Sequence, residues 1–320
     1  MSVSSKHPEY LRYSDTWQRV RAACEGSRSV KAGRSKYLPK PTTESSDIDL
    51  RSTNDHRYRQ YIDRAVYANF CGRTLAGLKG AAFRKLPDIV LPAGLEYLEE
   101  NATGSGTGLV QMAKDELQEL LSIGRDGFLV DYPMVESGAS AEQTKGIEAR
   151  ILPYTAENVI NWRTGIINGK TQLTLTVLRE CVNVSDDEFE YVEKDQYRVL
   201  RLVDGIYSQQ IYQDDKPVDF IPFCFAGAVN NDFTIDEAPM EGMAEVNIAH
   251  YRNSADIEEN SFIHGQLTLG VTSSLSSDQW QEANPDGLVV GSRAGHFLGE
   301  SGGFHHVQAE ASSLTRELMQ

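Results

Sequence analysis

The longest helical stretch in the sequence runs from Met240 to His264, without a proline and with no glycine after Gly242. Pro239 stands just before it, and proline is favoured in the first turn of a helix. At about 1.5 Å per residue, the stretch predicts a rod roughly 36 Å long. This helix constrains the fold more than any other feature of the sequence.

The predicted helix separates its side chains by chemistry when residues are placed about 100° apart. An apolar stripe contains Met240, Ala244, Ile248, Tyr251, Ala255 and Phe262. A charged strip contains Glu241, Glu245, Arg252, Asp256 and Glu259. A third face contains Met243, Val246, Asn247, His250, Ile257 and Ser261. An ordinary amphipathic surface helix explains the pattern equally well, so these faces alone select no function.

The rest of the chain predicts an α+β fold. Helices are expected at 10–23, at 58–79 and from 109 to about 123, the last one capped by Thr107. Strands are expected at 128–132, 172–178, 197–203, 206–212 and 221–226, with a turn at Asp204-Gly205 joining an antiparallel pair. Residues 26–41 and 136–146 are expected to be loops, 266–272 and 287–291 are β-prone, and a new helix is expected to start near Glu310.

The net charge of −15 is unevenly distributed. Residues 1–90 hold 17 Lys/Arg against 9 Asp/Glu, net +8, and residues 91–320 hold 14 against 37, net −23. The acidic total argues against a protein that grips DNA through its phosphates. No apolar run reaches the ~18 residues of a membrane span, and the first thirty residues lack a signal-peptide core. The scattered cysteines Cys24, Cys71, Cys181 and Cys224 predict buried, reduced thiols.

Three segments contain residue types found in catalytic or ligand-binding motifs, but each lacks the neighbouring residues that such a motif needs. The segment TGSGTG at 103–108 precedes a helix but lacks a preceding apolar strand and a following Gly-Lys-Ser/Thr. His296, His305 and His306 have no carboxylate or cysteine at a ligand spacing, and the acids around 186–190 are typical of a solvated connection. We therefore expect no catalytic residue, no metal and no cofactor. The alternative from another class is a carboxylate-dependent small-molecule hydrolase.

Several segments resemble a family of tailed-bacteriophage portal proteins, the head-tail connectors, long known only as a phage domain of unknown function. AEVNIAHYRNSADIEE at 244–259 is similar to the stem-helix signature of that family. The resemblance extends, in the same order, to KHPEYLRYSDTWQRVR at 6–21, YANFCGRTLAGLKGAAFRK at 67–85, GRDGFLVDYP at 124–133, YTAENVINWR at 154–163, TVLRE at 176–180, YRVLRLVDG at 197–205 and IPFCFAGAVNN at 221–231.

The resemblance implies a portal-protein fold with a mixed α/β wing, a long stem helix and a small β-containing clip. The implied regions are a basic helical region at 1–90, the wing at 91–235, the first stem helix at 236–265, the clip at 266–308 and the start of a second stem helix at 309–320. Family members continue further, so we expect a chain truncated before the crown.

The resemblance also implies a non-enzymatic function. Identical subunits form a ring, expected to be dodecameric, at a capsid vertex, through which double-stranded DNA is packaged and ejected without sequence-specific binding. The implied partners are the terminase, head-completion or adaptor proteins and the capsid protein, in the virion and, during assembly, in the host cytoplasm, with no membrane involved. Another capsid or head-completion protein remains an alternative.

Two roles are expected for the long helix within such a ring. The charged strip of Glu241, Glu245, Arg252, Asp256 and Glu259 is predicted to face the channel, where repulsion would keep DNA moving. Ile248, Tyr251, Ala255 and Phe262 are predicted to pack within the subunit against a second stem helix. Val246 and Ile257 are predicted to contact a neighbouring subunit, because a helix in a ring needs more than one packing face.

Overall fold

The computed structural model describes residues 3–41, 53–132, 148–167, 169–183, 189–203, 205–210, 221–265, 268–285, 287 and 296–307. The fold is mixed α+β, as predicted, with helices and antiparallel sheets. Contacts divide the chain into two compact units. The first unit comprises Met1–Tyr37 with Tyr67–His250, and the second comprises Leu38–Val66 with Tyr251–Gln320. The five predicted regions are defined by resemblance and stay predictions.

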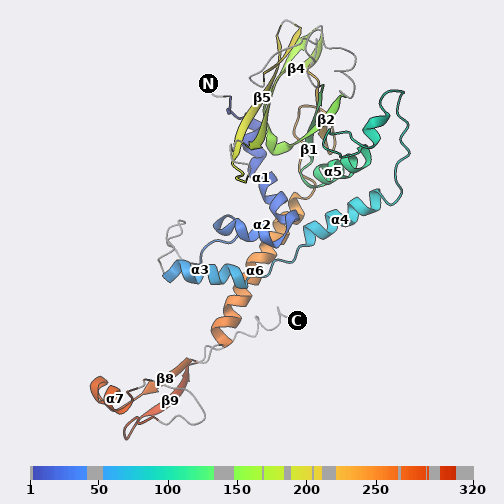
Figure 1. Cartoon of the computed structure of the whole chain (residues 1–320). Coiled ribbons are helices and arrows are strands. Elements are labelled where there is room, and N and C mark those ends of the chain that lie inside the picture. Colours follow the sequence, from blue (N-terminus) through green and yellow to red (C-terminus); the bar gives the residue numbers. More distant parts are fainter. Residues whose placement is uncertain are drawn as a thin grey trace. The chain divides into compact units, whose positions relative to one another are not determined.

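The first unit contains two antiparallel sheets and most of the helices (Figure 1). Its helical elements are α1 (Pro8–Glu25), α2 (Ser27–Ala32), η1 (Arg34–Lys36), α4 (Phe70–Ala82), η2 (Glu96–Glu99), α5 (Leu109–Ser122), η3 (Ala156–Asn158) and the beginning of α6 (Glu241–Gly265). Its strands are β1 (Arg125–Asp131), β2 (Arg150–Thr155), β3 (Val159–Ile167), β4 (Lys170–Asn183), β5 (Glu193–Val203), β6 (Ile206–Gln210) and β7 (Phe223–Gly227).

The two sheets of the first unit have the orders β2-β1-β7 and β3-β4-β5-β6. The predicted hairpin is confirmed, because β5 and β6 pair antiparallel with Val203 opposite Ile206. Side chains from both sheets and from α1 form one core, in which Trp17, Ile123, Leu129, Leu178 and Leu200 are fully buried. Ion pairs of Arg21 also connect α1 to α5 and η3. Its guanidinium binds Glu119 of α5 at 2.7 Å and Glu157 of η3 at 2.6 Å.

The second unit contains α3 (Thr53–Arg64), the rest of α6, β8 (Thr268–Thr272), α7 (Ser277–Ala283) and β9 (Gly303–Val307). β8 and β9 form an antiparallel pair, with Gly270 opposite His305. The predicted β-prone segment at 266–272 is therefore confirmed for its described part. The predicted helix near Glu310 and the predicted loop at 136–146 lie outside the described residues.

Some predicted elements differ from the structure. The single helix predicted at 58–79 is wrong, because α3 ends at Arg64 and α4 begins at Phe70, where the Asn69 side chain accepts a hydrogen bond from the Gly72 amide at 2.8 Å. Thr107 is not the cap of α5, whose N-cap residue is Gly108. The stretch predicted as a loop at 26–41 contains α2 and η1. No helix among the described residues is both long and apolar enough to cross a membrane.

Candidate interaction surfaces of helix α6

Helix α6 confirms the predicted length, since it runs from Glu241 to Gly265. Most of the predicted apolar stripe is buried within the chain itself. Ala244 and Ile248 are buried in the first unit, and Tyr251 and Ala255 are buried in the second. Phe262, near the end of the stripe, is 40% exposed. The expected partner of the stripe, a second stem helix at 309–320, lies outside the described residues and stays a prediction.

Asn247 is a buried polar residue on α6 that binds the start of α4. Its side-chain oxygen accepts hydrogen bonds from the amides of Phe70 at 3.1 Å and Cys71 at 3.2 Å. Its side-chain nitrogen donates to the Ala68 carbonyl at 2.8 Å. The first amides of a helix have no partner within the helix, so Asn247 supplies one from a segment distant in sequence. Sequence reasoning placed Asn247 on a packing face but missed this role.

Within the first unit, a cation of α1 binds the two acidic side chains at the N-terminal end of α6. Arg19 lies 2.9 Å from the Glu241 carboxylate and 3.1 Å from the Glu245 carboxylate. The Thr16 hydroxyl donates a further hydrogen bond to Glu241 at 3.2 Å. Negative side chains are favoured at the N-terminus of a helix, and Arg19 offsets their mutual repulsion. The sequence signal for this contact is only the basic excess of residues 1–90.

In the second unit, α3 supplies the partners of α6. Glu259 forms ion pairs with Arg57, at 3.1 Å, and with Arg64. The Tyr61 hydroxyl donates to the Asp256 carboxylate at 2.5 Å, and burial together with this carboxylate raises the pKa of Tyr61. Arg64 also lies over the Phe262 ring, 4.0 Å from its centroid. Opposite charges and aromatic contacts therefore join α3 to this part of α6.

These contacts change the interpretation of the predicted charged strip. Arg252 is the one cation within the strip itself, and Arg19, Arg57 and Arg64 from other helices also bind its acids. Glu259 is especially enclosed, with a side chain only 12% exposed. A single chain contains no channel, so the prediction that the strip faces one stays a prediction. The strip is, however, a contact surface for helices of its own chain.

The side of α6 opposite the buried stripe carries apolar residues that no described part of the chain covers. In the first unit, Val246 is 70% exposed and Met243 and His250 are also exposed. In the second unit, Ile257 is half-buried. Val246 and Ile257 are the two residues predicted to contact a neighbouring subunit. Val246 is the more exposed of the two and is therefore more accessible to such a contact. Met243, Val246 and His250 lie three and four residues apart on one face of the helix, so together they form a candidate contact for another molecule.

The first unit has a surface hollow of about 600 Å³, large enough for a small molecule. It lies where residues 5–9 run beside β3, with His7 stacked on Trp162 at 4.1 Å between ring centroids. Burial and the nearby Arg125 lower the pKa of His7. Glu9 is the one carboxylate in the lining. The hollow therefore does not supply the pair of carboxylates that the hydrolase alternative needs.

Two carboxyl groups form a buried pair elsewhere in the first unit, between α5 and β1. Burial, and a hydrogen bond with Glu116, raise the pKa of Asp126 to about 10. Burial also raises the pKa of Glu116. The Gly127 amide donates to the Asp126 carboxyl at 2.9 Å. Two carboxyl groups in contact share a proton because they cannot both ionise at low cost. We assign this pair to the packing of α5 on β1, which Figure 1 shows side by side.

The glycine-rich loop at 103–108 uses its own amides internally. The Gly106 amide donates to the Asn101 side chain at 2.8 Å, and the Ser105 amide is 3.3 Å from the Thr103 hydroxyl. The prediction that this segment precedes a helix is confirmed, because α5 begins at Leu109. Within the part of the chain that the structure describes, no three His, Cys, Asp or Glu residues converge on a metal position. The side chains of His305 and His306 are not among those described, so the expectation of no metal stays a prediction.

Comparison with known families gives a match to the C-terminal part of the chain. A family model described as Domain of unknown function (DUF4055) matches residues 239–320, which begin two residues before α6. This is a phage-associated domain, so the predicted resemblance is confirmed in its coarser form for this part of the chain. No curated protein matches the chain.

Proposed function

We propose that this chain is a portal subunit of a tailed bacteriophage. Copies of it form a ring-shaped channel at one capsid vertex, through which DNA enters and leaves and to which the tail or head-completion proteins attach. The observation that carries the proposal is α6, a 25-residue helix at the start of the phage-associated match, with one side buried and Val246 exposed on another. A helix with this arrangement can pack in its own subunit and against a neighbour.

The proposed subunit is structural and is not an enzyme. The motor that consumes ATP is the terminase, and the portal supplies a passage and a docking platform. The described hollow and the buried Glu116–Asp126 pair supply no acid–base pair open to substrate, and this favours the structural function over the hydrolase alternative.

The ion pairs of α6 refine how the helix functions in such a ring. Arg19 and Arg64 bind strip residues from the chain's own α1 and α3. Within each unit these ion pairs fix the position of α6 against a neighbouring helix. A helix that lines a channel needs such a fixed position. In this proposal the strip retains net negative charge at its exposed members, Glu245 and Asp256, and these residues are the part of the strip proposed to face DNA.

Mass photometry of the purified protein tests the proposal. A subunit of 35.6 kDa that forms a ring is expected to give one dominant particle at a high multiple of that mass. A single species at the monomer mass, at every concentration measured, would contradict the proposal. Incubation with ATP is expected to release no phosphate beyond a buffer blank, and a saturable rate would instead favour an enzyme.

A further inference from the structure

Helix α4 is the most exposed long helix of the first unit. Of its 13 residues, only Cys71 and Leu75 are buried. Phe70 is 51% exposed, although its ring meets His250 edge-on at 5.8 Å, and Leu78 is 46% exposed. Ala76 and Ala81 are also exposed. The helix therefore presents an apolar outer face that no described part of the chain covers.

Two glycines lie on this outer face without a reason in the chain's own packing. A Cβ atom added at Gly77 or Gly80 would meet nothing within 4 Å. Neither residue has the positive φ that favours glycine. Glycine is the least favourable residue in a helix interior apart from proline. Glycine does allow another backbone to approach a helix closely, so a partner surface would account for both positions.

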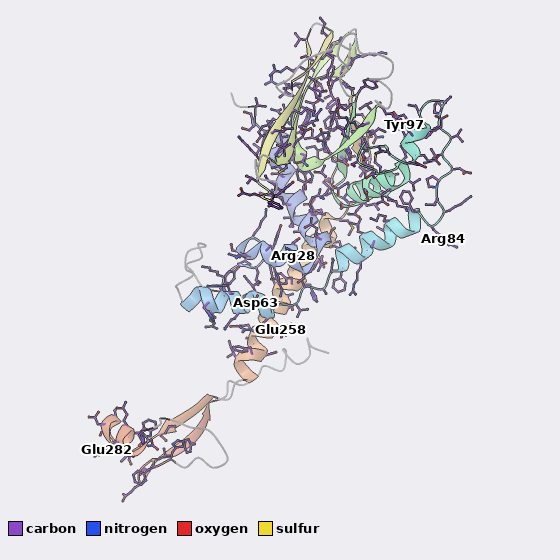
Figure 2. All side chains as sticks on the ribbon, viewed as in Figure 1. Arg28, Asp63, Arg84, Tyr97, Glu258 and Glu282 are labelled. Atoms are coloured by element: carbon purple, nitrogen blue, oxygen red, sulfur yellow. The ribbon has the colours of Figure 1, made fainter. Side chains whose placement is uncertain are left out.

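The charged residues of α4 and of the segments next to it in the sequence are all positive. From Tyr67 to Pro87 the sequence contains Arg73, Lys79, Arg84 and Lys85 and no Asp or Glu. Among the described residues, no carboxylate lies within ion-pair distance of Arg73, Arg84 or Lys85. Figure 2 places Arg84 just past the last turn of α4. A surface that is both apolar and cationic fits an acidic protein surface with apolar residues of its own.

We propose that the α4 face binds the acidic η2 segment of a second copy of this chain. The α4 face is defined as Phe70, Gly77, Leu78 and Gly80 together with the cations Arg73, Arg84 and Lys85. Glu96, Glu99 and Glu100 of this segment are exposed, and the neighbouring Leu95 adds exposed apolar surface. No described cation forms an ion pair with these three glutamates. Figure 2 marks the segment by Tyr97, which lies within η2.

The α4 face and the η2 segment are formed by different residues of the same unit. In the proposed ring, each copy offers its α4 face to one neighbour and its η2 segment to the other, which is a head-to-tail contact. Such contacts close into a ring or extend into a filament. The inference rests on the proposed function in one respect, which is that copies of the chain assemble into a ring. It goes further by naming which two surfaces meet.

Two charge-reversed proteins test the inference. One carries Arg73→Glu, Arg84→Glu and Lys85→Glu, and the other carries Glu96→Lys, Glu99→Lys and Glu100→Lys. In either variant alone, every head-to-tail contact brings like charges together, so the variant is expected not to assemble. Its circular dichroism spectrum is expected to stay that of the wild type, because the subunit still folds. Mixed in equal amounts, the two proteins alternate, every contact regains opposite charges, and assembly is expected to return. Mass photometry measures all three samples.

The outcomes separate this inference from the proposed function. Rings in either variant alone, or a mixture that stays unassembled, would overturn the α4–η2 contact and leave the portal proposal standing. A wild-type protein that remains monomeric would overturn both. As an independent arm, Gly77→Ala with Gly80→Ala is expected to raise the thermal midpoint of the monomer, because alanine favours helix, and to weaken assembly by closing the approach. Unchanged assembly in this variant would contradict the close contact.

Discussion

The side-chain oxygen of Asn247 accepts a hydrogen bond from the backbone amide of Phe70 at 3.1 Å, across 177 residues of sequence. The same side chain binds Cys71 and Ala68, so one amide group on α6 satisfies three backbone groups at the start of α4. Because Asn247 is buried, water does not readily replace it. This residue therefore fixes where α4 begins in the first unit.

Asn247→Ala is expected to destabilise the protein by about 3 kcal/mol, because buried backbone groups lose their partners. Urea denaturation followed by circular dichroism measures the change. Asn253→Ala is the matched control, since Asn253 is exposed on the same helix, and its effect is expected to stay within about 0.5 kcal/mol. Equal effects of the two substitutions would show that the Asn247 contacts contribute little.

Glu259→Gln is expected to destabilise the protein by about 2 kcal/mol, because it removes the charge that Arg57 and Arg64 bind at a largely buried position. Glu258→Gln serves as the control, because the adjacent Glu258 forms no ion pair with any described residue. Thermal unfolding of both variants measures the difference. If Glu259→Gln unfolds at the wild-type temperature, the ion pairs of α3 and α6 do not stabilise the second unit.

The Glu116–Asp126 pair predicts a particular pH dependence of stability. Folding raises the pKa of Asp126 to about 10, so the folded protein keeps a proton that the unfolded chain releases above pH ~4. The resulting stability is fully present below pH ~4 and is lost as pH rises towards 10. Asp126→Asn keeps the acceptor for Gly127 and removes this loss, so its free energy of unfolding should fall less between pH 5 and 9 than that of the wild type.

The control for this pH measurement is Asp115→Asn, an exposed carboxylate on α5. It is expected to keep the wild-type pH dependence. Parallel curves for wild type and Asp126→Asn would mean that the pair does not hold a proton in the folded protein.

Val246→Asp tests the uncovered side of α6. Val246 is exposed, so the monomer should fold as before, while a charge placed in a subunit contact should dissolve the assembly. The sequence predicted the same contact for Ile257, but Ile257 is half-buried, so its replacement would also disturb the second unit. Mass photometry and circular dichroism together report the result. A particle of unchanged mass would remove Val246 from the proposed contact.

The sequence predicted those elements whose signals are local. Helix α6 follows from an uninterrupted stretch after Pro239, and the β5–β6 hairpin follows from alternating residues around Asp204-Gly205. Helix α7 was missed although its signal is also local, since Ser276 and Gln279 form a capping box. The break between α3 and α4 was missed because Asn69 was not recognised as a helix cap.

The contacts of α6 could not be predicted from the sequence. Arg19 and Asn247 bind residues more than 170 positions away, and no periodicity within one segment indicates such a partner. The helical pattern correctly separated an apolar stripe from a charged strip. It could not show that the strip meets Arg57 and Arg64 of the same chain, because that pairing depends on tertiary packing.

Negative-stain electron microscopy of the purified protein tests the central claim most directly. The portal proposal predicts rings with a central hole wide enough for duplex DNA, formed by identical subunits. Uniform compact particles of monomer size, without a hole, would contradict it.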